Sequence, residues 1–216
     1  MFTGIIQGVG TVAAREALGD GVRLTLRVPG PLQGLSDGTS LAVNGTCLTV
    51  VKADGEDLVF DAVGATLRCT RIGEFAPGDR VNLEPSLTLG GPVDGHLVTG
   101  HVDDMAEVTS LTEGEGAVYY EFEVSKELAC QIAIRGSVAV DGVSLTVSGV
   151  HGRRFTVSIV PYTLEHTIFG DYRPGSRVHV ETDVLAKYVQ RLTSEGLTSE
   201  GLTSEGGLPS PAEATS

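Results

Sequence analysis

An internal repeat constrains the fold of this 216-residue chain more than any other feature. "SLAVNGTCLTV" (40–50) aligns with "SVAVDGVSLTV" (137–147) at a shift of 97 residues. The same shift aligns "TLRCTRIG" (66–73) with "TLEHTIFG" (163–170), and "PGDRVNLE" (77–84) with "PGSRVHVE" (174–181). A shift of 96 aligns "TGIIQGVGTV" (3–12) with "TGHVDDMAEV" (99–108). Because the register holds over so many separated segments, the chain contains a duplicated unit of about half its length.

Each unit has the pattern of short β-strands. Runs such as "VRLTLRV", "DLVFDAV" and "RFTVSIV" are rich in β-branched residues and are separated by Gly, Pro and Asp turns. Several such strands per unit predict a small barrel, because closure removes exposed strand edges. We therefore expect one domain at 1–96 and a second at 97–181.

Helical segments are few and short. One is expected at 125–134, where Ser125 can cap the N-terminus and Glu127 lies in the first turn; its counterpart in the first unit is "PGPLQGL". Another is expected at 182–192, with apolar residues at helical spacing. These residues are Val184, Leu185, Tyr188, Val189 and Leu192. This helix needs a packing partner, and the pattern leaves open whether that is its own barrel or an oligomer axis.

Composition excludes several classes of function. Hydrophobic residues make up 41% and charged residues 20%, a balance typical of globular proteins. The formal net charge of -13 argues against nucleic acids and membrane surfaces as partners. The N-terminus has no pattern of a signal peptide, which predicts a cytoplasmic protein.

The cysteines and the C-terminal tail add two further expectations. Cys47, Cys69 and Cys130 are odd in number and widely spaced, so reduced thiols and no metal site are expected. The tail at 193–216 repeats "LTSEG", and a five-residue period places no apolar stripe on a helix. The tail is therefore expected to be mobile and solvated.

Differences between the two copies carry the chemical information. A duplicated barrel can bind one kind of ligand twice, or duplication can simply enlarge the core. A titratable or nucleophilic group present in only one copy would give two bound ligands unequal roles. The unlike pairs are Cys47 and Ser144, Ile5 and His101, Gly64 and Pro161, and Ser86 and Asp183.

Every one of these polar residues also has a structural interpretation. Cys47 in an apolar strand is more often a small buried hydrophobe than a reactive thiol. His101, with His96 close by in "GHLVTGHV", can be a structural hydrogen-bonding group. Ser144 can bond the backbone, and Asp183 can be the N-terminal anion of its helix.

Five segments together resemble the riboflavin synthase family, of the type built from two lumazine-binding repeats. They are "MFTGII", the pair "NGTCLTV" and "DGVSLTV", "GHLVTGHV", "PYTLEHT" and "VETDVLAKYV". The likeness spans residues 1 to about 192.

The resemblance implies an all-β fold of two six-stranded Greek-key barrels, with a helix at 182–192 that forms a homotrimer. It implies that each active site lies between the N-terminal barrel of one subunit and the C-terminal barrel of another. Two molecules of 6,7-dimethyl-8-ribityllumazine would give riboflavin and 5-amino-6-(ribitylamino)uracil by transfer of a four-carbon unit, without a metal or redox cofactor. Association with lumazine synthase is a further expected partnership.

The resemblance also assigns the site residues. Cys47, His101, Ser144 and Asp183 match the family's polar active-site residues, and Phe2 matches its N-terminal aromatic. We expect His101 to shuttle a proton, Cys47 and Ser144 to lie beside the ligand ring, and Asp183 to contact the second ligand. The expected substrate-binding residues are Gly4, Ile5, Ile6, Leu48, Thr49, Asp61, Ala62, Val63, Gly64, Ala65, Thr66, Gly100, Val102, Arg135, Val143, Leu145, Thr146, Pro161, Tyr162, Thr163, Leu164 and Glu165.

The chain departs from the family pattern at several positions. Ala65, preceded by Gly64, stands where a Glu is usual, and Arg135 where a Lys is common. Other departures are Asp94, Asp104, Tyr162 and His179. They keep open a paralogue that acts on a modified lumazine. A non-catalytic lumazine or flavin carrier and a barrel oligomer without a ligand are the remaining alternatives.

Overall fold

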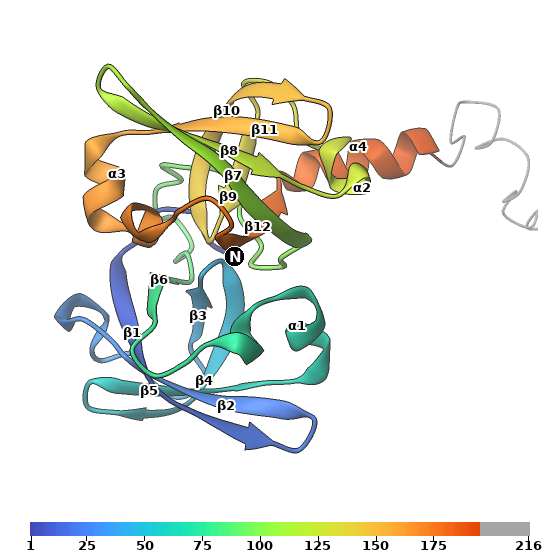
Figure 1. The fold of residues 1–216 in the computed structure, drawn as a ribbon. Helices are drawn as coiled ribbons and strands as arrows, with labels where there is room; N and C mark the ends of the chain where they lie inside the picture. Colours follow the sequence, from blue (N-terminus) through green and yellow to red (C-terminus); the bar gives the residue numbers. More distant parts are fainter. Residues whose placement is uncertain (195–216) are drawn as a thin grey trace, which may run out of the picture.

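Two closed six-stranded antiparallel barrels make up the computed structural model, which describes residues 1–194 (Figure 1). The first contains β1 (Gly8–Leu18), β2 (Gly21–Arg27), β3 (Ser40–Val43), β4 (Thr46–Asp54), β5 (Asp57–Ala62) and β6 (Arg80–Pro85). The second contains β7 (Asp104–Gly114), β8 (Ala117–Glu123), β9 (Ser137–Val140), β10 (Val143–His151), β11 (Arg154–Ile159) and β12 (Arg177–Thr182). The strand order β1-β2-β5-β4-β3-β6 recurs as β7-β8-β11-β10-β9-β12, which confirms the predicted duplicated fold.

The change of shift from 96 to 97 has a structural location. The second strands of the two barrels, β2 and β8, still correspond at a shift of 96, whereas β3 and β9 correspond at 97. The extra residue therefore lies in the connection between them. Here the first copy has a 3₁₀ turn at Gly30–Leu32 and the second has the helix α2 (Lys126–Ala129).

The helices correct the sequence expectations in detail. Ser125 caps α2 as predicted, but α2 ends at Ala129 because tight turns then bring Ile132 into the barrel core. The last helix, α4 (Val184–Ser194), begins after Asp183, whose carboxylate accepts the Leu185 N–H at 2.9 Å. Two helices were not predicted, α1 (Gly64–Cys69) and α3 (Pro161–His166). Most of the predicted 193–216 tail lies outside the described residues.

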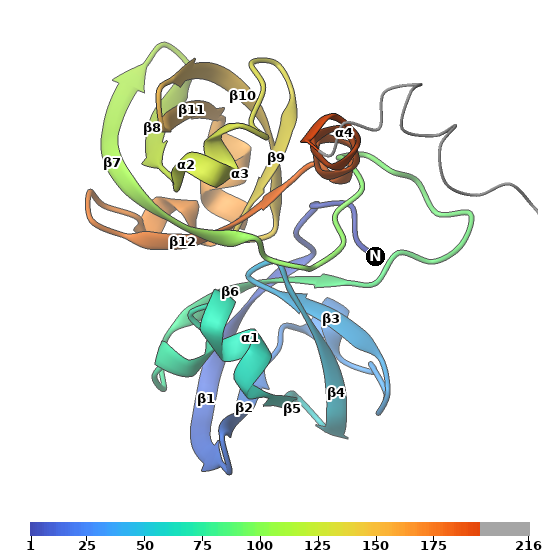
Figure 2. The same cartoon turned by 90° about the vertical axis from the view of Figure 1, so that its right-hand side faces the viewer.

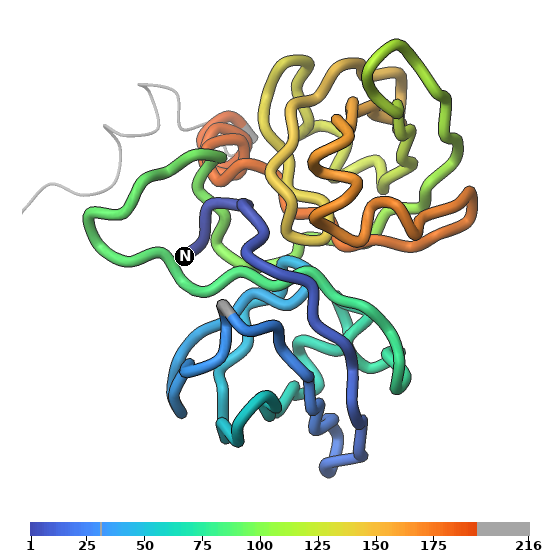
Figure 3. The backbone as a smooth tube through the Cα atoms, turned by 90° about the vertical axis from the view of Figure 1, so that its left-hand side faces the viewer, coloured from blue at the N-terminus to red at the C-terminus, as the bar shows by residue number. Residues whose placement is uncertain are grey.

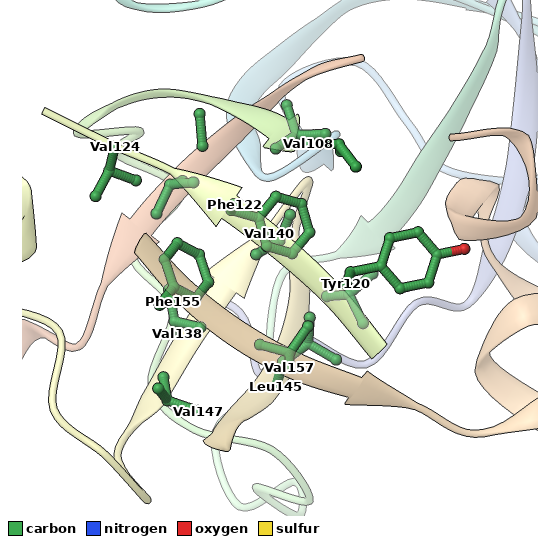
Figure 4. Close-up of a cluster of buried hydrophobic side chains, with 14 of the residues drawn as sticks. Val108, Tyr120, Phe122, Val124, Val138, Val140, Leu145, Val147, Phe155 and Val157 are labelled. Carbon is green, nitrogen blue, oxygen red and sulfur yellow. The ribbon is translucent and has the colours of Figure 1, made fainter. Parts of the chain in front are cut away.

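The interiors of both barrels are filled with apolar side chains. Alternate residues of each strand face inward, as in β2, where Val22, Leu24 and Leu26 are buried. Figure 4 shows the second core, in which the Phe122 and Phe155 rings stack with centroids 5.1 Å apart. A ligand must therefore bind on the outer surface of a barrel, because neither interior has room for it.

The two barrels meet through pairs of reciprocal contacts. Across the interface, Arg80 of the first unit forms an ion pair with Asp171 of the second at 2.7 Å. The equivalent residues, Arg177 of the second unit and Glu74 of the first, pair at 2.9 Å. At the centre, Gly45 faces Gly142, and a Cβ on Gly45 would lie 2.7 Å from the Gly142 nitrogen. The two copies are thus related by an approximate twofold axis through these glycines.

His179, which stands at the position of Asn82 in the first copy, makes the same kinds of hydrogen bond in this interface. In the first copy Asn82 donates to the Asp141 carbonyl at 2.9 Å and accepts the Ile168 N–H at 2.9 Å. His179, the counterpart of Asn82, accepts the Arg71 N–H on Nε2 at 2.7 Å. Its Nδ1 lies 2.8 Å from the carbonyl oxygen of Asn44 and therefore donates. The imidazole reproduces the donor and acceptor of an amide.

The segment that precedes the first strand of each unit packs against the barrel of the other unit. The N-terminal segment runs between the two barrels (Figure 3). Phe2 in this segment pairs with Val98 as an antiparallel bridge. Ile6 packs against the core of the second barrel although it precedes the first one. Each unit therefore contributes a short segment to the other.

Helix α4 lies beside the second barrel, and its C-terminal end projects away from both barrels (Figures 1 and 2). It is held by a Lys187–Asp103 ion pair at 2.7 Å and by a Gln131–Gln190 bond at 2.6 Å. Its apolar stripe does not pack on its own barrel: Leu185 and Tyr188 are 69% and 66% exposed. No helix within residues 1–194 is both long and apolar enough to cross a bilayer.

Candidate functional site

Two equivalent outer-surface patches carry the predicted site residues, and we call them cradles. In β4 the side chains of Thr46, Leu48 and Val50 face inward, so Cys47 and Thr49 face outward. In β10 the same alternation puts Ser144 and Thr146 on the outside. The first cradle is centred on Cys47 and the second on Ser144.

The first cradle is completed by a segment from the second unit. The Cys47 N–H donates to the Gly100 carbonyl at 2.9 Å. Gly100 has φ +83°, and a Cβ there would lie 2.6 Å from the Cys47 Cβ and 2.8 Å from Phe2. Only glycine allows this approach. His101 follows directly and is exposed, so the structure brings Cys47, Gly100 and His101 together.

The second cradle is completed in the same way by the N-terminal segment. The Ser144 N–H donates to the Gly4 carbonyl at 2.8 Å. Gly4 has φ +75°, and a Cβ there would lie 2.6 Å from the Ser144 Cβ. Ile5, the counterpart of His101, follows and is 37% exposed. The two cradles thus share one backbone design but differ in their side chains.

His96 makes the largest difference between the cradles. Its Nδ1 lies 2.7 Å from the Ser144 hydroxyl oxygen. The imidazole is only 8% exposed, and its Nε2 is the one buried side-chain nitrogen or oxygen within residues 1–194 that has no hydrogen-bond partner. Among the residues that the structure describes, Cys47 in the first cradle has no histidine partner of this kind. An unpartnered buried nitrogen beside a paired serine is suited to proton transfer.

The charge state of His96 is set by burial and by two carboxylates. Burial lowers the pKa of His96, while the negative charges of Asp183 and Glu181 raise it. The net effect favours the neutral imidazole. A neutral ring can accept the hydroxyl proton of Ser144.

Asp183 has a structural role and an electrostatic one. It caps α4 through the Leu185 N–H, as the structural interpretation proposed. It also lies close enough to His96 to raise the pKa of that imidazole. The carboxylate therefore links the exposed helix with the second cradle.

Phe2 is a packing residue in this structure. It is fully buried and clusters with Ala42, Val98 and Ala139, with Cys47 against the same cluster. Its predicted contact with a ligand remains a prediction, whereas its contact with the first cradle is direct.

The remaining predicted binding residues fall into three groups. Leu48, Ala62, Val143 and Leu145 have buried side chains, so only their backbone can face a ligand. Asp61 is bonded by Arg23 at 2.7 and 2.8 Å and is therefore already paired. The others lie at exposed or half-buried positions. These positions are in the two segments that cross to the opposite barrel (the crossing segments, residues 3–6 and 99–102), in strands β4 and β10, and at the starts of α1 and α3. The residues of this group are Gly4, Ile5, Ile6, Thr49, Val63, Gly64, Ala65, Thr66, Gly100, Val102, Thr146, Pro161, Tyr162, Thr163, Leu164 and Glu165, with Gly4 and Gly100 themselves buried.

The departures from the family pattern make the starts of α1 and α3 unlike each other. Ala65 leaves the first helix without a polar side chain at that position. At the equivalent place Tyr162 is 69% exposed and stacks on His166, with ring centroids 4.0 Å apart. Arg135 lies between α2 and β9 with φ +64°, and its N–H donates to Val147 at 2.8 Å.

Comparison with known proteins agrees with the fold and with its duplication. The model of the lumazine binding domain matches twice, at residues 3–86 and 99–183. The chain therefore belongs to the lumazine-binding domain family. Relatives named riboflavin synthase include that of Mycobacterium tuberculosis H37Rv, 44% identical over 89% of this chain and 98% of the relative, and that of Bacillus subtilis 168, 38% identical over 88% and 89%.

Solved structures show the same architecture. Crystal structures of LumP complexed with 6,7-dimethyl-8-(1'-D-ribityl) lumazine and with riboflavin superpose with TM-scores of 0.77 and 0.79. Both are 28% identical and cover 84% of this chain and 99% of that protein.

Proposed function

We infer that this protein is an enzyme of the transferase class with riboflavin synthase activity. It converts two molecules of 6,7-dimethyl-8-ribityllumazine into riboflavin and 5-amino-6-(ribitylamino)uracil. Full-length relatives of that name at 38–44% identity support this activity. The observation that carries it is the pair of like cradles with unlike side chains, because identical ligands must act as donor and acceptor.

The second cradle is proposed to supply the proton transfer. The C7 methyl group of the lumazine is acidic because its anion delocalises into the ring, so a modest base suffices. Neutral His96, 2.7 Å from Ser144, can take the hydroxyl proton as Ser144 receives the methyl proton, either directly or through a bound water. This assignment moves the main proton-transfer role from His101, which is exposed, to His96.

The first cradle is proposed to hold the other ligand. Cys47 would lie beside its ring and His101 would relay a proton, while Asp183, directly before α4, would contact a polar edge of the second ligand. Thr49 and Thr66, with Thr146 and Thr163 in the second cradle, offer hydroxyl groups to ribityl chains. Holding two rings in reacting orientation supplies much of the rate acceleration.

We propose that the working form is a homotrimer. Each cradle lies on an outer surface, and the exposed apolar stripe of α4 needs a cover. Three copies packed through α4 would bury the stripe and set the first barrel of one copy against the second barrel of another. We also propose that the reaction needs no metal or redox cofactor. The protein would be cytoplasmic and would associate with lumazine synthase.

Incubation of the purified protein with 6,7-dimethyl-8-ribityllumazine tests the activity. Riboflavin should appear, measured by its absorbance and fluorescence, and dialysis against EDTA should leave the rate unchanged. Binding of the lumazine without turnover would replace the enzyme with a carrier. Absence of both binding and turnover would favour a modified substrate.

A further inference from the structure

Two buried glutamates occupy equivalent places next to the cradles. Glu84 lies in β6 of the first barrel and Glu181 in β12 of the second, and they are 4% and 3% exposed. The proton transfer proposed above uses neither as an acid or base. Burial of a carboxylate is costly unless it is hydrogen-bonded, so their partners indicate their purpose.

Both carboxylates bind the crossing segments with the same geometry. Glu84 accepts the Thr3 N–H and hydroxyl at 2.7 Å each and the Gly4 N–H at 2.9 Å. Glu181 accepts the Thr99 N–H and hydroxyl at 2.7 Å each and the Gly100 N–H at 3.0 Å. Each carboxylate thus fixes two successive residues with charge-assisted bonds.

The segments that they fix belong to the cradles of the opposite barrels. Glu84 is part of the first barrel, but Gly4 bonds Ser144 in the second. Glu181 is part of the second barrel, but Gly100 bonds Cys47 in the first.

We propose that Glu84 and Glu181 are positioning residues that act crosswise, each holding in place the ligand cradle of the other barrel. Glu84 serves the Ser144 cradle through Thr3 and Gly4. Glu181 serves the Cys47 cradle through Thr99 and Gly100. The identity of the ligand rests on the proposed function, whereas the crossed connection rests on the hydrogen bonds alone.

Glutamine is the sharpest substitution because it keeps the size of the side chain. Its amide NH₂ replaces one acceptor oxygen, and it would face backbone N–H groups that cannot accept a hydrogen bond. Glu181 also raises the pKa of His96. We therefore measure ligand binding, because turnover would also change with the pKa of His96.

Single thiols can report on each cradle separately. With Cys69→Ser and Cys130→Ser, Cys47 is the only thiol and reports on the first cradle. Adding Cys47→Ser and Ser144→Cys moves the thiol to the second. Alkylation by iodoacetamide is followed with and without riboflavin, and the concentration giving half-protection is recorded. Glu84→Gln and Glu181→Gln are introduced into both reporters.

The two variants should have opposite effects. Glu181→Gln should raise the half-protecting riboflavin concentration about tenfold or more at Cys47 and leave the Ser144→Cys reporter unchanged. Glu84→Gln should do the reverse. Equal effects of both variants at both thiols, or effects of each within its own barrel, would overturn the proposal.

Two further measurements keep the test decisive. Thr3→Val and Thr99→Val remove only the hydroxyl bonds and should give the same crossed pattern with smaller shifts if the Gln variants fold poorly. If neither unmodified reporter is protected by riboflavin or by the lumazine, the proposed function fails. In that case alkylation rates without ligand decide: each Gln variant should change the rate several-fold at the opposite thiol only, and unchanged rates would overturn the crossed connection.

Discussion

Replacement of His96 by glutamine tests the proposed proton transfer most sharply. His96→Gln keeps a polar group near Ser144 but removes the base. A positioned general base contributes about 10²- to 10⁴-fold to a rate, so kcat should fall about 100-fold or more. Ser144→Ala should cost a similar factor, because the two side chains act as one unit across 2.7 Å.

The rate of the double variant shows whether His96 and Ser144 act as one unit. His96→Gln with Ser144→Ala should be scarcely slower than either single variant, since the second change removes nothing that still functions. Riboflavin formation under saturating lumazine is the assay, and His151→Gln, on an exposed position of the same strand, is the control. Losses that multiply in the double variant, or a His96→Gln enzyme with the normal rate, would refute the assignment.

The pH profile follows from the environment of His96. Burial lowers its pKa, so the acid limb of kcat/KM should lie below the usual histidine value of about 6.5. Asp183 raises this pKa, so Asp183→Asn should move the limb to still lower pH, whatever its effect on the rate. A limb that stays in place would contradict the electrostatic link.

Three further predictions concern stability and assembly. Burial raises the pKa of Asp141, so the folded state binds this proton more tightly than the unfolded state, and stability should fall as the pH rises through the raised pKa. Asp141→Asn copies the equivalent Asn44. In urea denaturation it should be more stable than the parent at about pH 8 and lose this advantage near pH 4. Gly45→Ala should cost about 2–4 kcal/mol because its Cβ would lie 2.7 Å from the Gly142 nitrogen. Gly55→Ala, with φ +63° and open space, should cost only about 1–2 kcal/mol. Leu185→Asp on α4 should give monomers in sedimentation velocity and abolish turnover; an active monomer would reject the trimer.

Much of the fold could be predicted because duplication and strand patterns are local features of the sequence. The repeat register and the β-rich runs indicated two equivalent all-β units, and Ser125 and Asp183 marked helix starts that the structure confirms. The short helices α1 and α3 escaped because neither has a side-chain cap, and both are too short for an apolar stripe to be recognised. In each helix one half-buried side chain, Leu67 or Leu164, packs against the core of its barrel.

The candidate site was only partly predictable. Cys47 and Ser144 stood out as unlike residues in like segments, but comparison of the copies could not reveal His96, which lies in the segment that joins the two units. The crossing of the two units is equally hidden, since the hydrogen bond from the Ser144 N–H to the Gly4 carbonyl joins residues far apart in sequence. Two signals could have suggested it, namely glycines before Ile5 and His101 and glutamates at the same place in both repeats.

The product balance of a single reaction mixture tests the central claim most directly. If two like cradles make identical ligands react unequally, two molecules of 6,7-dimethyl-8-ribityllumazine should disappear for each riboflavin formed, with one 5-amino-6-(ribitylamino)uracil released. Chromatographic quantification of all three compounds over time gives this ratio. Stoichiometric binding of the lumazine with no products, or riboflavin formed without the uracil, would contradict the account.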